Sequence, residues 1–162
     1  MTENNDLAAR IQALEDLESI RKMKHKYFRC IDRALWDELV DDCFTREAVA
    51  DFGEYGIVQG REKLREFYRD KVGSAYKLCV HQGHNPEIDL TSETTATGIW
   101  QLENFMVTVK PEKGYWIAAF YEEEYARENG KWKISKTKIP LIFWSDLEKG
   151  WVKERFSPIP GG

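Results

Sequence analysis

A long helical stripe of apolar residues near the start of the chain is the feature that constrains the fold most. Between residues 6 and 31 the apolar side chains recur at intervals of three or four, at Leu7, Ile11, Leu14, Leu17, Ile20, Met23, Tyr27 and Ile31. This spacing places them on one face of an α-helix, which must then pack against another apolar surface. Such a helix is long for a small domain. We therefore expect residues 1–8 to form a loosely held arm or an oligomer contact.

Beyond this stripe the pattern changes in two steps. Helices are predicted over 35–44 and 61–69, with two short strands, 48–53 and 55–60, between them. From Lys77 onward, β-branched and aromatic residues predict strands over 78–82, 87–90, 94–110, 115–127 and 132–144.

The connections between the later strands favour a meander. Segments 111–114 and 128–131 contain glycine and predict hairpin turns. Three helices followed by a long antiparallel meander define an α+β fold. The simplest packing curls the sheet around the helices and leaves an apolar cavity between them. We expect a single domain over 1–162, in which 146–162 form a C-terminal tail or flap.

Composition narrows the class of protein. The net charge is −4 with both signs interspersed, which argues against a nucleic-acid partner. The chain has no apolar run of membrane-spanning length, so no membrane partner is expected, and its polar, acidic start does not resemble a signal peptide. The chain has three cysteines, Cys30, Cys43 and Cys79, which are far apart, so they indicate neither a disulfide framework nor a zinc site. We expect each to be a small core residue, and the compartment to be reducing and therefore cytoplasmic.

The candidate chemistry lies at His81 and Asp32. An imidazole titrates near neutral pH, so His81, which follows the apolar segment 78–80, is either a general base or a core histidine satisfied by backbone. Asp32 interrupts an apolar run. It is therefore either a carboxylate with a partner in a pocket or the cap of a helix that starts at Arg33. Asp32 is the obvious acceptor to orient His81.

Tyr27 is the third candidate, because its hydroxyl can donate a hydrogen bond or a proton. It lies five residues before Asp32, which is about 140° around an ideal helix. Both side chains can face one pocket only if the helix ends or bends near Cys30. We therefore predict that Asp32 sits at a helix terminus.

Other kinds of site are disfavoured by the spacing of their residues. His81, His84 and Glu87 follow one another at intervals of three residues. On a strand this spacing places the two histidines on opposite faces, so they cannot readily bind one ion and no metal is predicted. The chain has neither a phosphate-binding P-loop nor a G-x-S-x-G elbow, so we expect neither dinucleotide nor acyl-serine chemistry, and no cofactor.

Several segments resemble the SnoaL-like branch of the nuclear-transport-factor-2-like superfamily. The bile acid 7α-dehydratases are the most similar members, and scytalone dehydratases and hexachlorocyclohexane dehydrochlorinases are more distant. The resemblance extends over about residues 10–145 and is carried by Lys26 to Asp32, Trp36 to Leu39, His81 to Ile88, and Thr95 to Trp100. It implies a cone, in which a curved mixed sheet wraps around the N-terminal helices as a cystatin-like α+β barrel with a deep hydrophobic pocket.

The resemblance also implies catalytic roles. Tyr27 matches the pocket tyrosine of the family, and Asp32 matches the aspartate that pairs with a histidine. His81 matches that histidine, the general base that removes a proton next to the leaving group.

On the last strand the chain departs from the family, because the arginine of the bile acid dehydratases and dehydrochlorinases is missing. The equivalent positions fall on Leu141 or Thr137. Lys136 or Lys138 would take the place of the arginine if either side chain faces inward.

We therefore expect a cofactor-independent lyase or isomerase that acts on a hydrophobic cyclic small molecule by His-Asp general base catalysis. The alternatives are a non-catalytic ligand-binding or assembly subunit of the same fold, favoured by the missing arginine, and a hydrolase that uses the same pocket. Aromatic residues are the candidates for substrate binding, namely Tyr55, Trp100, Phe120 and Phe143. Similar families form dimers or trimers, so we expect a homo-oligomer whose contact is the outer face of the sheet.

Overall fold

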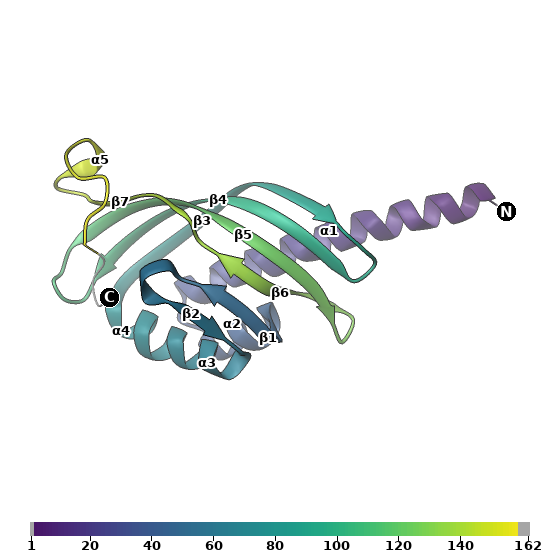
Figure 1. Ribbon diagram of the computed structural model, residues 1–162, viewed down its shortest axis with the longest axis horizontal. Helices are drawn as coiled ribbons and strands as arrows, with labels where there is room; N and C mark the ends of the chain where they lie inside the picture. Colours follow the sequence, from purple (N-terminus) through teal and green to yellow (C-terminus); the bar gives the residue numbers. More distant parts are fainter. Residues whose placement is uncertain (1, 159–162) are drawn as a thin grey trace.

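The first helix runs well past the body of the molecule. The computed structural model describes residues 2–158, and helix α1 spans Thr2–Asp32. Its N-terminal half projects beyond the sheet (Figure 1), which leaves Leu7, Ile11 and Leu14 exposed. From Ile20 onward the same stripe is buried. The expected arm is therefore helical from Thr2, and Met1 lies outside the described residues.

The remaining helices are short. Helix α2 spans Trp36–Cys43, and α3 (Arg61–Glu66) continues through the π-helical segment η2 (Phe67–Val72) into α4 (Gly73–Ala75). A single 3-10 turn, η1 (Gly53–Tyr55), joins the first two strands.

The sheet is mixed, curved and unclosed. Its strands are β1 (Phe44–Asp51), β2 (Ile57–Gln59), β3 (Tyr76–Leu90), β4 (Thr95–Thr108), β5 (Gly114–Glu128), β6 (Lys131–Lys138) and β7 (Leu141–Asp146). The order is β2-β1-β6-β5-β4-β3, with β7 paired to β5. Strands β1 and β6 are parallel, whereas the other pairs are antiparallel. The α+β class and the curved mixed sheet are confirmed.

Three element boundaries differ from the prediction. Segments 78–82 and 87–90 belong to one strand, β3, because a bulge between His84 and Glu87 accommodates the Asn-Pro sequence. The predicted strand over 132–144 is two strands, since Pro140 has no N–H to continue the ladder between β6 and β7. Phe44 begins β1 instead of ending α2.

The core lies between the concave face of the sheet and the buried half of α1. Along β4 and β5 buried and less buried residues alternate, as expected for strands with one face on a core. The helix approaches β3 so closely at Gly83 that a Cβ there would lie 2.3 Å from the Phe28 ring. Glycine at this position therefore lets α1 reach the strand that carries His81.

The C-terminal segment turns back along β7. Helix α5 (Gly150–Lys153) is followed by a bridge between Trp144 and Phe156. The Trp151 ring contacts Trp116 and Phe143, so this segment packs at one end of the molecule (Figure 1). Residues 159–162 lie outside the described part of the chain. Among the helices of residues 2–158, none has the length and apolar character that a membrane span requires.

Candidate active site

The last residue of α1 and the middle of β3 meet in a hydrogen-bonded pair. Asp32 Oδ1 lies 2.7 Å from His81 Nδ1, and both Asp32 carboxylate oxygens accept the His81 backbone N–H at 3.1 Å. Because Asp32 ends α1, its side chain is free to point away from the helix, and the prediction of a helix terminus is confirmed. The alternative that Asp32 caps the next helix is wrong, because α2 has Leu35 at its N-cap and no side-chain cap.

The pair fixes the position of the imidazole ring. The His81 side chain is 8% exposed and its ring stacks on Phe28. A carboxylate can only accept, so the network assigns a proton to Nδ1 and directs Nε2 away from Asp32.

The surroundings of His81 act on its pKa in opposite directions. Burial disfavours the charged ring and lowers the pKa, whereas Cys79 and the Asp32 carboxylate favour the imidazolium. The second effect prevails and raises the pKa of His81 to about 9. In the resting protein at neutral pH the ring therefore carries a second proton.

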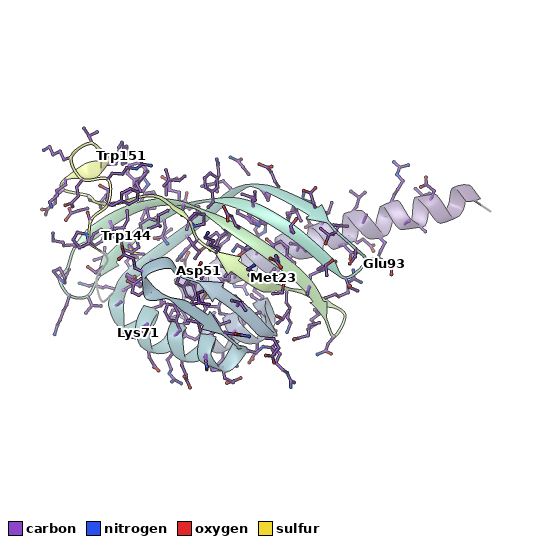
Figure 2. All side chains as sticks on the ribbon, in the orientation of Figure 1. Met23, Asp51, Lys71, Glu93, Trp144 and Trp151 are labelled. Carbon is purple, nitrogen blue, oxygen red and sulfur yellow. The ribbon has the colours of Figure 1, made fainter. Side chains whose placement is uncertain are left out.

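A cavity of about 360 Å³ opens beside this pair. Its largely apolar walls come from the end of α1, from β1 and the turn η1, from η2, and from strands β3 to β7. Asp51 and Trp144, both labelled in Figure 2, belong to the lining. The volume lies within the range of small-molecule sites, about 300–1,000 Å³.

Three completely buried tyrosines form part of the wall. Tyr27, Tyr68 and Tyr121 all line the cavity, and the Tyr27 and Tyr68 hydroxyls lie 3.3 Å apart. Burial raises the pKa of all three well above the usual value. The hydroxyls therefore stay protonated and can serve as hydrogen-bond donors. The sequence indicated Tyr27, but not its two partners.

Cys79 and Asn104 also line the cavity and were not singled out as site residues. Cys79 Sγ lies 3.6 Å from His81 Nδ1 and 4.0 Å from Nε2. Asn104, opposite His81 on β4, donates from Nδ2 to Cys79 Sγ at 3.5 Å. A usable signal was present, because Cys79 precedes His81 by two residues and so shares its face of the strand.

Of the four residues predicted to bind substrate, one lines the cavity and three do not. Tyr55 lines the cavity. Trp100 is instead buried in the core, where its Nε1 donates to the Tyr125 hydroxyl at 2.9 Å. Phe120 lies on the opposite face of β5 from Tyr121, and Phe143 packs against Trp116 outside the cavity. The expectation that Trp100, Phe120 and Phe143 reach the pocket is therefore corrected.

The residues considered at the position of the missing arginine also differ in whether they line the cavity. Thr137 is buried and donates to Glu123, and Lys136 pairs with Glu124 on the surface. Lys138 and Leu141 both line the cavity. Lys138 also lines a surface pocket with Lys136, Glu122 and Glu124, so it borders both the cavity and the outer surface.

A buried ion pair lies behind the tyrosines. Lys24 Nζ and Glu123 Oε1 are 2.6 Å apart and both side chains are completely buried. The ammonium also lies over the Tyr27 and Tyr121 rings, at 4.1 and 3.5 Å from their centroids. Lys24 is therefore buried although it lies next to the surface residue His25 in the sequence.

One group of residues has the composition of a metal site. Asp32, Cys79 and His81 present ligand atoms within 4.8 Å of one another. Two ligands of a tetrahedral cation at about 2 Å are separated by about 3.3 Å. The 2.7 Å between Asp32 Oδ1 and His81 Nδ1 therefore fits a shared proton better than a shared cation.

Comparison with known proteins places this chain in a family. The model of the SnoaL-like domain family matches residues 12–138. The chain therefore belongs to the SnoaL-like domain family. The narrower resemblance to bile acid 7α-dehydratases stays a prediction.

Particular relatives are similar at low identity. Gamma-hexachlorocyclohexane dehydrochlorinase of Sphingobium indicum is 25% identical over 92 residues, which cover 57% of this chain and 59% of that protein. The match thus spans less than two thirds of the relative. A type 2 hexachlorocyclohexane dehydrochlorinase (LinA) superposes with a TM-score of 0.81 at 22% identity, over 94% of this chain and 99% of that chain.

A scytalone dehydratase-like protein of Novosphingobium aromaticivorans superposes with a TM-score of 0.78 at 18% identity, over 94% of this chain and 99% of that chain. At sequence identities this low, the two structural similarities establish the fold alone.

Proposed function

We propose that this protein is a cofactor-independent lyase that eliminates water or another small group from a hydrophobic cyclic molecule. The observation that carries the proposal is the Asp32–His81 pair on the wall of a largely apolar cavity. A related isomerase reaction would use the same first step, the removal of a proton from carbon.

His81 would act as the base through Nε2. Asp32 holds Nδ1, so the ring cannot turn, and the carboxylate stabilises the imidazolium that forms when Nε2 takes the proton. A positioned base of this kind contributes about 10²–10⁴ to the rate. Because the pKa of His81 is raised, the neutral ring is a strong base but a minor species at pH 7.

The tyrosines would stabilise the charge that grows on the opposite side of the reaction. Removal of the proton pushes electrons toward a carbonyl oxygen or a departing group. The protonated hydroxyls of Tyr27 and Tyr68 belong to buried side chains, and buried donors form strong hydrogen bonds to a developing anion. Tyr27 is the proposed acid or hydrogen-bond donor, as the family resemblance implies.

Two further observations support the reaction class. The relatives above carry the names of a dehydrochlorinase and a dehydratase, both eliminating enzymes. Lys138 is among the residues that line the cavity and is the candidate to assist an anionic leaving group in place of an arginine.

The test is a screen for elimination. Cyclic hydroxylated and chlorinated compounds, γ-hexachlorocyclohexane included, are incubated with the protein and examined by mass spectrometry for loss of water or HCl. We expect His81→Gln to lower kcat by about 10²–10⁴ while the circular dichroism spectrum stays native. His84→Gln is the matched control, because His84 is exposed three residues further along β3.

Other outcomes identify the alternative functions. Retained turnover in His81→Gln would contradict the base assignment. Incorporation of ¹⁸O from labelled water into the product would indicate hydrolysis. Ligand binding without turnover, equal in wild type and His81→Gln, would identify a binding module.

A further inference from the structure

The three cysteines differ sharply in their access to the cavity. Cys30 and Cys43 are completely buried, whereas Cys79 is partly exposed and lines the cavity. Burial raises the pKa of Cys43 to about 12 and also raises that of Cys30, so neither thiol is reactive. Any thiol chemistry of the folded chain therefore belongs to Cys79.

The neighbours of Cys79 are those of a nucleophilic thiol. Cys79 Sγ lies 3.6 Å from His81 Nδ1, which Asp32 holds at 2.7 Å, and 4.0 Å from Nε2, which the carboxylate leaves free. An imidazole that is held by a carboxylate and lies beside a thiol can activate a cysteine. The elimination proposed above makes no use of the sulfur.

Asn104 supplies an independent observation. Its side chain is 2% exposed and lies in the cavity wall, yet within residues 2–158 the only hydrogen-bond partner of its amide is the Cys79 sulfur, at 3.5 and 3.8 Å. Contacts of that length to sulfur are weak, and a buried amide usually has stronger partners. The amide is thus available to a carbonyl oxygen that enters beside the thiol.

We propose that Cys79 is a modification site that adds covalently to α,β-unsaturated carbonyl compounds admitted by the cavity. The reacting form is the ion pair in which the second proton of His81, on Nε2, is the one that the thiol has given up, and the thiolate sulfur forms a bond to the β carbon. The electrons of the C=C π bond pass to the enolate, whose oxygen accepts a hydrogen bond from Asn104 Nδ2. The α carbon then takes a proton from His81, so S–H is added across the double bond without an oxidant or reductant.

The proposed ligands of Cys79, α,β-unsaturated carbonyl compounds, are related to the products of the elimination proposed above. β-Elimination next to a carbonyl produces a conjugated enone, which is the electrophile that such a thiol would capture. That connection rests on the proposed function, but the reactivity of Cys79 does not. An adduct on Cys79 would occupy the space in front of His81 and stop elimination.

The experiment measures addition directly. N-ethylmaleimide and 2-cyclohexen-1-one are each added to the full chain at pH 7, and the adducts are located by peptide mass spectrometry. We expect the mass of Cys79 to increase by that of the intact reagent. The rate of this addition should be at least tenfold higher than at the same cysteine in urea-unfolded protein. Cys30 and Cys43 should stay unmodified in the folded protein, and Cys79→Ser should take up no reagent.

The role of the histidine is tested by variants and by pH. His81→Gln should slow the addition at least tenfold, and His84→Gln should leave its rate unchanged. Should His81→Gln fail to fold, the wild type answers the question alone. A lone thiol loses about tenfold in rate per pH unit below its pKa, whereas Cys79 should lose less than tenfold between pH 8 and pH 6.

Two results would overturn the proposal. One is a rate at Cys79 no faster than in unfolded protein, and the other is a folded His81→Gln variant that reacts as fast as wild type. These failures are separate from a failure of the elimination screen, because no turnover is needed to see the adduct.

Discussion

His81 and Asp32 meet because a helix and a strand each bring one polar side chain to the point where they cross. Gly83 lets the helix approach, and the helix ends at the residue whose carboxylate is needed. The resemblance of the 26–32 and 81–88 segments predicted this pair from the sequence. Cys79 and Asn104 were not predicted. The spacing of two residues from His81 could have indicated Cys79, whereas Asn104 lies on another strand and gives no signal until the pairing of β3 with β4 is known.

The raised pKa of His81 makes stability depend on pH. A group whose pKa is higher in the folded than in the unfolded chain stabilises the fold fully below the unfolded value, about 6.5, and this contribution is lost as pH rises through the folded value, about 9. At about 1.4 kcal/mol for each unit of pKa, the wild type should lose on the order of 3 kcal/mol between pH 6 and pH 9.5. Urea unfolding at the two pH values measures this loss.

The variant His81→Gln serves as the reference for that experiment. It has no titrating ring at this position, so its free energy of unfolding should change less over the same interval. An identical pH dependence in the two proteins would contradict the proposed coupling of His81 to Asp32.

At the scale of the elements, the turn after α1 holds the site and is itself strained. Ala34 has φ of 55° and links α1 to α2. A left-handed conformation costs an L-residue about 1–2 kcal/mol, whereas glycine adopts it freely. Sequence periodicity predicted both helices, but it could not predict that an alanine would take this conformation, since nothing in Arg33-Ala34-Leu35 favours it.

Substitution of Ala34 by glycine should therefore stabilise the protein. The side chain is exposed, so no packing is lost, and after the extra entropy of glycine in the unfolded chain the gain should be about 0.5–1 kcal/mol. The midpoint of thermal or urea unfolding measures it. Ala34→Val, which is disfavoured at positive φ, should change the midpoint in the opposite direction, and a destabilised Ala34→Gly would contradict the account.

The buried Lys24–Glu123 pair attaches α1 to β5. Removing one partner leaves an uncompensated buried charge, so Lys24→Met should destabilise the protein by about 3–5 kcal/mol. The double variant Lys24→Met, Glu123→Gln should recover part of this loss. Lys22→Met is the control, because Lys22 pairs with Glu18 on the surface and its loss should change stability by less than about 0.5 kcal/mol. Urea unfolding of Lys24→Met within that margin of wild type would refute this account.

At the scale of the whole molecule, the sheet divides the aromatic residues into two populations. The inner ones close the core and the cavity. The outer ones include Phe105, Trp116, Phe143 and Trp151, whose rings contact one another on the other face. The alternation within β5 was readable from the sequence, but not which face points inward. For this reason Phe120 was expected in the pocket.

The expected homo-oligomer is best tested on this outer face. Light scattering coupled to size-exclusion chromatography should give a mass that is a multiple of 19.0 kDa. Trp116→Glu should lower the mass, because it puts a charge among the outer rings, whereas the surface control Lys63→Glu should not. A single 19.0 kDa species at micromolar concentration would rule the oligomer out.

The measurement that bears most directly on the central claim is an NMR titration of the His81 ring nitrogens in wild type and in Asp32→Asn. The chain has only three histidines, so His81→Gln assigns the signal without ambiguity. We predict a pKa well above 6.5 in the wild type, near the value of about 9, with Nδ1 protonated in the neutral ring and a clear fall in the pKa when Asp32 is replaced. A His81 that titrates at or below 6.5 and ignores Asp32 would contradict the pair on which the proposed function depends.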